Sequence, residues 1–219
     1  ELRSLVRSGS LGGVVLMDVA QGDEREAMLL DEEIPTVLIG SSGRAVRAPG
    51  VDTDFVQMAH ASVEHLAGLG HRRIVALMRE TAHDDAHARQ DQAHELLLAA
   101  GDLGVDVLVR QVPELALAGG DIVGADGLVE GCSAVISNNP AAVVGLACAA
   151  QAHGLSIPAD LSVLTLGVTE CRGRQGDSFS ELSVDREAMG AAVGSLLLAR
   201  LRGKPDPVER RTLMPAFLR

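Results

Sequence analysis

The stretch AVISNNPAAVVGLACAAQAHGLSIPADLSVLTL, residues 134–166, contains one complete strand–helix–strand unit. Ala134–Ile136 and Leu161–Leu166 are short and continuously apolar, which is typical of strands covered on both faces of a sheet. Pro140–His153, between them, is expected to be a helix, with proline in its first turn and Gly154 just past its end. A helix that joins two such strands predicts a doubly wound parallel α/β fold.

The same alternation runs through the rest of the chain. Apolar runs of strand length precede longer segments with helical spacing, so we expect parallel sheets with helices on both faces. The other expected strands are Leu11–Met17, Ile34–Ile39, Gly50–Asp54 and Ile74–Met78, and the other expected helices are Gly22–Glu33, Phe55–Leu69, Ala86–Ala100 and Asp185–Leu201. Polar and glycine-rich stretches predict loops at Arg44–Gly50, Gly119–Gly131 and Cys171–Ser180. Connections from strand to helix lie at the carboxyl edge of such a sheet, where ligands bind.

The composition excludes several classes of function. The chain has 219 residues, 47% of them apolar, which is enough for one large domain or two small ones. Its net charge of −11 repels phosphate groups, so we do not expect this segment to bind nucleic acid by itself. With three Phe and no Trp or Tyr, an aromatic platform for sugars or bases is not expected. No uncharged apolar run reaches the length of about 18 residues that a membrane span needs, so no membrane association is expected.

Two motifs suggest chemistry, but a simpler explanation is favoured for each. His83-Asp-Asp-Ala-His87 offers metal-ligating groups, yet acidic residues at the start of a helix explain the same pattern. Cys171 lies beside Arg172 and Arg174, which suits a reactive thiolate, but no catalytic partner is evident. Cys148 lies in an apolar helix and is expected to be a small core residue. We therefore expect no metal ion, no cofactor and no enzymatic activity.

Two asparagines lie between the strand and the helix of the first unit described. In Ser137-Asn138-Asn139-Pro140, either asparagine can cap the helix that begins at Pro140. One alternative is that both only cap the helix, and the other is that one caps while its neighbour points toward a ligand. An amide is both donor and acceptor, so the second alternative suits a polyol or amide ligand.

Several phrases, in order along the chain, resemble the core domain of the lactose/galactose-repressor (LacI/GalR) family of bacterial transcription regulators. They are Ile34–Ile39, Val63–Ile74, Ser137–Asn139 with Gly145, Gly154–Val163, Leu182–Gly190 and Leu213–Arg219. The resemblance covers essentially the whole chain. It implies a two-lobed, periplasmic-binding-protein-like fold, in which three crossovers join two doubly wound subdomains and a small-molecule effector binds in the cleft between them.

The resemblance also implies where the subdomains begin and end. Residues 1–53 would form part of the N-terminal subdomain, 54–182 the C-terminal subdomain, 183–211 a return to the first, and 212–219 the final strand of the second. The crossovers would lie near Val51–Phe55, Leu182–Asp185 and Thr212–Pro215. Glu1–Ser8 has the pattern of the inside of a helix. We therefore expect a fragment that lacks the family's helix-turn-helix and its first strand–helix–strand.

Ligand-binding residues are implied at positions that match the family. These are Arg89, Asn138 and Asp54, to which we add Asp18 after the first expected strand. Gly167 and Val168 replace an acidic pair of the family. The implied effector is a sugar or a related metabolite. Operator DNA would be bound by the absent N-terminal helix-turn-helix and not by this segment.

The helix that begins at Pro140 suggests a homodimer. Residues 141–152 contain no charged side chain, and a helix that is apolar around most of its circumference is covered on more than one side. We predict that a stripe of Val143, Leu146, Ala147 and Ala150 contacts a second copy across a two-fold axis. The alternative is that the segment Gly119–Gly131 covers the helix within one chain.

Two classes of function fit this reading of the sequence. The first is the effector-binding and dimerisation domain of a repressor, and the second is a solute-binding protein of a transport system. The residues upstream discriminate between them, because a repressor begins with a helix-turn-helix and a secreted binder with a signal peptide. Three cysteines without a pairing pattern favour the cytoplasm. An enzyme is least favoured, since no nucleophile and base are evident.

Overall fold

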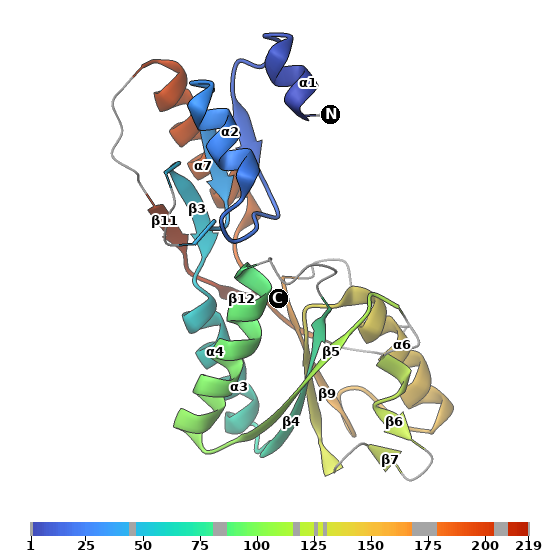
Figure 1. The fold of residues 1–219 in the computed structure, drawn as a ribbon. Coiled ribbons are helices and arrows are strands. Elements are labelled where there is room, and N and C mark those ends of the chain that lie inside the picture. The colour runs from blue at the N-terminus through green and yellow to red at the C-terminus, as the bar shows by residue number, and fades with distance from the viewer. Residues whose placement is uncertain are drawn as a thin grey trace. The chain divides into compact units, whose positions relative to one another are not determined.

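The computed structural model describes residues 2–43, 47–80, 87–115, 119–124, 127–128, 131–167, 179–203 and 210–218. They form two compact α/β units (Figure 1). At the described positions the first unit comprises residues 2–54, 87–88 and 184–214, and the second comprises 55–80, 89–183 and 215–218. Besides the step at 88–89, the chain passes between the units at 54–55, 183–184 and 214–215. The sequence placed these boundaries at 53–54, 182–183 and 211–212.

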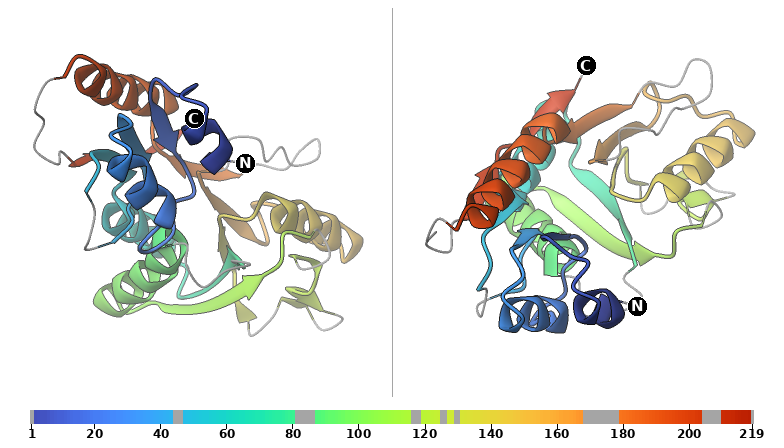
Figure 2. Two further views of the ribbon diagram at one scale, coloured as in Figure 1. Left: turned by 45° about the horizontal axis from the view of Figure 1, so that its top comes forward. Right: turned by 90° about the horizontal axis from the view of Figure 1, so that it is seen from above.

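The first unit is built on a parallel sheet of four strands. Its order is β1 (Val14–Leu16), β2 (Thr36–Ile39), β3 (Gly50–Thr53) and β11 (Arg210–Leu213). The helices α1 (Leu2–Arg7) and α2 (Glu24–Asp31) pack on one face, and α7 (Arg186–Leu201) packs on the other (Figure 2). Successive residues of β2 therefore enter different cores, Leu38 beneath α2 and Val37 beneath α7.

The predicted end of the second subdomain needs a correction. Thr212 and Leu213 were assigned to its final strand, but they belong to β11 in the first unit. Thr212 is paired with Asp52 and Leu213 with Thr53 in parallel register. Because β3 offers a free edge to this segment, the strand joins the first sheet before the chain crosses over. The final strand of the second unit is only β12 (Ala216–Leu218).

The second unit contains a sheet of six strands. Its order is β12, β10 (Ser180–Ser183), β9 (Ser162–Leu166), β8 (Ala134–Ser137), β4 (Arg73–Arg79) and β5 (Asp106–Val112). All neighbours are parallel except β12 and β10. A small antiparallel pair joins β6 (Val123–Gly124) and β7 (Gly127–Leu128). The predicted doubly wound α/β class is confirmed.

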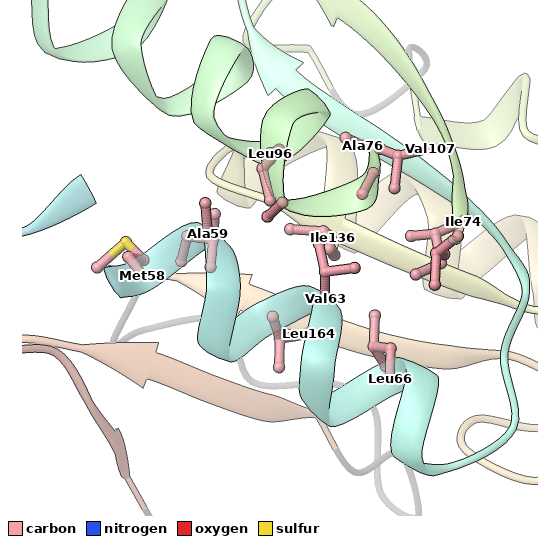
Figure 3. Close-up of a cluster of buried hydrophobic side chains, with 14 of the residues drawn as sticks. Met58, Ala59, Val63, Leu66, Ile74, Ala76, Leu96, Val107, Ile136 and Leu164 are labelled. Carbon is pink, nitrogen blue, oxygen red and sulfur yellow. The ribbon is translucent and has the colours of Figure 1, made fainter. Parts of the chain in front are cut away.

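Helices cover both faces of this sheet. Figure 1 shows α3 (Phe55–Gly68) and α4 (His87–Leu103) on one side and α6 (Pro140–Ala152) on the other. Figure 3 shows the core on the first side, which contains Val63 and Leu66 of α3 and Leu96 of α4. Ile136 and Leu164 close this core from β8 and β9. Among the helices of the described ranges, none is long and apolar enough to cross a bilayer.

The prediction for the uncharged helix is wrong in its choice of face. Val143, Leu146, Ala147 and Ala150 are between 0% and 5% exposed. They pack within the same chain against the second face of the sheet and against Ile122. The most strongly apolar side of α6 packs against the sheet of its own chain, so this stripe is not available to contact a second copy. The part of Gly119–Gly131 that the structure describes does contact the helix, as the alternative required.

The outward side of α6 also differs from the prediction. Cys148, expected in the core, is exposed, and Val144 is 46% exposed. These two residues are four apart and so lie on one face of the helix, opposite the stripe that packs on the sheet. The apolar surface left over on this helix is therefore the side that carries Val144.

A partly buried histidine, His71, joins three segments at the amino edge of the second sheet. Nδ1 of His71 lies 2.7 Å from Oγ of Ser133, and Nε2 lies 3.0 Å from Oγ of Ser162. A neutral ring donates from one nitrogen and accepts at the other, and both hydroxyls can complement it. Burial lowers the pKa of His71 below its ordinary value of 6.5, and the nearby His65 lowers it further.

We expect this histidine to make the second unit sensitive to acid. Because the folded pKa lies below the unfolded value of 6.5, the unfolded chain binds more protons between the two values. The stability from neutral His71 is thus fully present above pH 6.5 and is lost as the pH falls toward the folded pKa. Thermal unfolding of His71→Gln should depend less on pH between 7.5 and 5.5 than that of the parent. The exposed His94→Gln is the control, and an equal change in both variants would contradict the assignment.

Candidate functional site

The carboxyl edge of the second sheet carries a polar group centred on Asn138. This residue follows directly after β8 and is half-buried. Its Oδ1 accepts a hydrogen bond from the backbone N–H of Arg79 at 2.7 Å, at the end of the neighbouring strand β4. Its Nδ2 donates to Oε1 of Gln92 on α4, also at 2.7 Å. Asn138 therefore joins two strand ends and a helix at the edge where doubly wound sheets bind ligands.

Asn139 does the capping. It is fully buried, and its Oδ1 accepts the N–H of Ala142 at 3.1 Å in the first turn of α6. Its Nδ2 donates to the carbonyl oxygens of Val112, the last residue of β5, and of Pro113. The first alternative, in which both asparagines only cap the helix, is wrong, because Asn138 makes no bond to the helix start among the described residues. Whether Asn138 contacts a ligand stays a prediction. The amide of Asn138 is the one that lies beside α4.

Arg89 lies in the first turn of α4, one turn before Gln92. Residues three apart share a face of a helix, so the position of Arg89 is on the side of α4 that approaches Asn138. The side chain of Arg89 lies outside the described part of the structure. Gln92 itself was not predicted. Its only sequence signal is the spacing of three from Arg89, and its Nε2 lies 3.7 Å from Sδ of Met58 on α3.

The two predicted aspartates belong to the first unit, where each follows a strand. Asp18 comes after β1 with a φ of 47°, and its carbonyl oxygen accepts from the guanidinium of Arg25 at 3.0 Å. Asp54 comes after β3, and its backbone N–H donates to the carbonyl of Leu213 at 3.0 Å. Both positions lie at the carboxyl edge of the first sheet, on strands separated by β2. The structure thus places two of the predicted ligand residues in each unit.

An ion pair fixes the connection that carries Asp18. Asp23 caps α2, accepting the backbone N–H of Arg25 at 2.9 Å, and its Oδ2 lies 2.6 Å from Nη2 of the same arginine. The hydrogen bond from Arg25 holds the pKa of the Asp23 carboxyl below its usual value, against the effect of burial. The same bond raises the pKa of the Arg25 guanidinium. Since Arg25 also binds the carbonyl of Asp18, the loop at the end of β1 is held in one conformation.

The other two motifs singled out in the sequence were a possible metal site and a possible reactive cysteine. They contain no group of three or more His, Cys, Asp or Glu that could hold a metal ion. Positions 83–86 of the histidine–aspartate segment, and Cys171 with both of its arginines, lie outside the described residues. Cys132 is buried in the core beneath α6.

Comparison with known proteins identifies the fold. A family profile described as "Periplasmic binding protein-like domain" matches residues 63–219, more than half of the chain. A curated relative from Streptomyces limosus, an "Uncharacterized HTH-type transcriptional regulator in aml 5'region", is 27% identical over 207 residues. That alignment covers 90% of this chain and 58% of the relative, so the chain spans less than two thirds of the relative's length.

Solved structures agree over the full length of the chain. A regulatory protein of the LacI family from Chloroflexus aggregans has a TM-score of 0.82 and 23% identity, with 99% of this chain and 78% of that chain covered. A LacI family transcriptional regulator from Enterococcus faecium, solved with bound ribose, has a TM-score of 0.80 and 19% identity, with 99% and 80% covered. At these identities the likeness concerns the fold. The chain belongs to the periplasmic binding protein-like domain family, and its fold is similar to that of the LacI-family regulator structures.

Proposed function

We propose that this chain is the effector-binding and dimerising core of a bacterial DNA-binding transcriptional regulator of the repressor type. The observation that carries the proposal is the alignment of 90% of the chain with a helix-turn-helix regulator, together with the family match. The operator is bound by an N-terminal helix-turn-helix outside this segment, whose charge of −11 does not suit DNA. The domain acts in the cytoplasm and catalyses no reaction.

The effector is a small molecule, a sugar or a related metabolite. Arg89 and Asn138 are the ligand-binding residues that we propose in the second unit, and Asp18 and Asp54 are those that we propose in the first. Asn138, Asp18 and Asp54 each follow a strand at the carboxyl edge of a sheet, which is where this class of fold binds ligands. The ribose in the E. faecium regulator supports a sugar-like ligand for a domain of this fold.

The alternative is a solute-binding protein of a transport system with the same fold. It is less supported, because the curated relative that aligns with this chain is a regulator. The residues encoded upstream separate the two functions. A helix-turn-helix there supports the regulator, and a signal peptide supports the transport protein.

A ligand screen by thermal shift tests the proposal. A ligand that binds only the folded chain stabilises it by about 2.7 kcal/mol at a concentration of 100 times its Kd, so the melting temperature rises. We expect one or more mono- or disaccharides to raise it. Arg89→Ala should remove most of that rise, since a guanidinium binds ligand oxygens through paired hydrogen bonds. Arg3→Ala, at an exposed arginine of α1, should keep it. A screen in which no sugar changes the melting temperature would sink the proposal.

Dimerisation is proposed through the outward side of α6. This side carries Val144, exposed Cys148 and the half-buried Gly145, and the helix has no charged residue. Val144→Glu places a charge in that surface and is expected to convert a dimer to monomers in light scattering, with little effect on folding. Val56→Glu on α3, where the valine is 52% exposed, is the matched control. If both variants keep the mass of the parent dimer, α6 is not the interface.

A further inference from the structure

Arg79, at the end of β4, has hydrogen-bonding capacity that the described residues do not use. Its Nη2 lies 3.2 Å from Oε1 of Glu114, and 30% of its side chain is exposed. Its Nε is buried and has no hydrogen-bond partner among the described residues. A guanidinium has five N–H donors in one plane, so a single carboxylate oxygen leaves most of them unpaired. A buried donor without an acceptor is costly, and a ligand at this position would satisfy it.

The surroundings of Arg79 place it at the proposed effector site. Its backbone N–H is held by the amide of Asn138, which in turn bonds Gln92 on α4. Glu114 belongs to the short segment after β5, where Asn139 fixes the carbonyl of Pro113 at 3.1 Å. Both members of the ion pair are therefore positioned by the asparagines at the start of α6. The pair lies at the same carboxyl edge as Asn138.

We infer that Arg79 binds the carboxylate of an acidic sugar, and that Glu114 forms an ion pair with the guanidinium of Arg79 when no ligand is bound. The inference rests on the proposed function and narrows its ligand class. Arginine recognises a carboxylate with two parallel N–H···O bonds, which a single oxygen of Glu114 at 3.2 Å does not provide. A ligand carboxylate would use Nε as well as a terminal nitrogen. Glu114 is half exposed and can move away without leaving a buried charge behind.

An ion pair at the opposite end of β4 and β5 serves as a control for the pair of Arg79 and Glu114. Nε of Arg73, at the start of β4, lies 3.5 Å from Oδ2 of Asp106, at the start of β5. Both of these side chains are mostly exposed, at 51% and 70%. The amino edge of a doubly wound sheet is not the ligand-binding edge. Arg73 and Asp106 thus form an ion pair of the same kind without the proposed function.

Titration calorimetry on the whole chain tests the inference with sugars that differ only by a carboxylate. The pairs are D-glucuronate with D-glucose and D-galacturonate with D-galactose. We expect one acid to bind at least tenfold more tightly than its neutral partner, and less tightly as NaCl is raised from 50 to 500 mM. Arg79→Gln should abolish the preference. Glu114→Gln removes the competing charge and should strengthen binding of the acid severalfold, whereas Arg73→Gln and Asp106→Asn should change neither value.

The outcomes separate this inference from the proposed function. Binding of neutral sugars alone, or equal binding within each pair, would overturn the inference and leave the proposed function standing. Binding of no sugar at all would overturn both. Glu114→Gln keeps the test meaningful if Arg79→Gln fails to fold, because Glu114 is half exposed. An unchanged affinity for the acid in that variant would overturn the role assigned to Glu114.

Discussion

Replacing Gly119 with alanine is expected to destabilise the second unit by about 3 kcal/mol, the upper part of the range for overpacking a core. A β-carbon at this position would lie 1.7 Å from the carbonyl oxygen of Ala142 and 2.8 Å from the backbone nitrogen of Leu146. Both atoms belong to the backbone of α6, so neither can rotate away. Urea denaturation followed by far-ultraviolet circular dichroism measures the change in the free energy of unfolding.

The adjacent glycine is the control for this substitution. A β-carbon at Gly120 would meet only Cβ of Ala149, at the ordinary contact distance of 3.8 Å. Gly120→Ala is therefore expected to change the free energy of unfolding by less than about 1 kcal/mol. Equal losses in the two variants would show that segment 119–124 does not approach α6 as closely as described.

This close approach explains why the stripe on α6 was misassigned. A helix without charges has to be covered on more than one side, and that inference was sound. The sequence did not reveal that the cover comes from the same chain, because Gly119 and Ile122 lie in a glycine-rich stretch that reads as a loop. Glycine there allows backbone to approach backbone. Pattern alone does not distinguish that use of glycine from flexibility.

The fold was predictable where strands are buried on both faces. β4, β8 and β9 were found because their residues enter cores above and below the sheet, which selects continuous apolar runs. β5 was missed for the opposite reason. Among the described strands it pairs with β4 alone, so it lies at the edge of the sheet. Its Asp106, Arg110 and Gln111 interrupt the apolar pattern.

The sequence predicted where the candidate site lies, but it did not predict the hydrogen bonds within it. The resemblance pointed to Asn138, and Pro140 indicated that one asparagine caps a helix, yet only the structure assigns the capping to Asn139. The partners of Asn138 were not found from the sequence. Gln92 is 46 residues away and Arg79 is 59 residues away, and no local pattern encodes such pairings.

The second large effect is expected at Glu26, a buried acid on α2 that holds the connection after β2. Its Oε1 accepts the backbone N–H groups of Arg47 and Ala48, both at 2.8 Å, and its Oε2 accepts the hydroxyl of Ser42. Glu26 is 4% exposed, so water cannot replace it without rearrangement. Glu26→Ala leaves these donors unpaired and is expected to cost about 3 kcal/mol of unfolding free energy, since each buried unpaired donor costs about 1–3 kcal/mol.

The same substitution connects stability with ligand binding. Ser42 follows β2 at the carboxyl edge of the first sheet, between the strands that position Asp18 and Asp54. We therefore expect Glu26→Ala to reduce the thermal shift produced by an effector as well as the melting temperature. Glu24→Ala, at an exposed acid two residues away on the same helix, should leave both unchanged. Glu26→Gln keeps an oxygen for the two backbone donors, so it should recover most of the stability. A Glu26→Gln variant as unstable as Glu26→Ala would show that the charge, and not the set of hydrogen bonds, holds this connection.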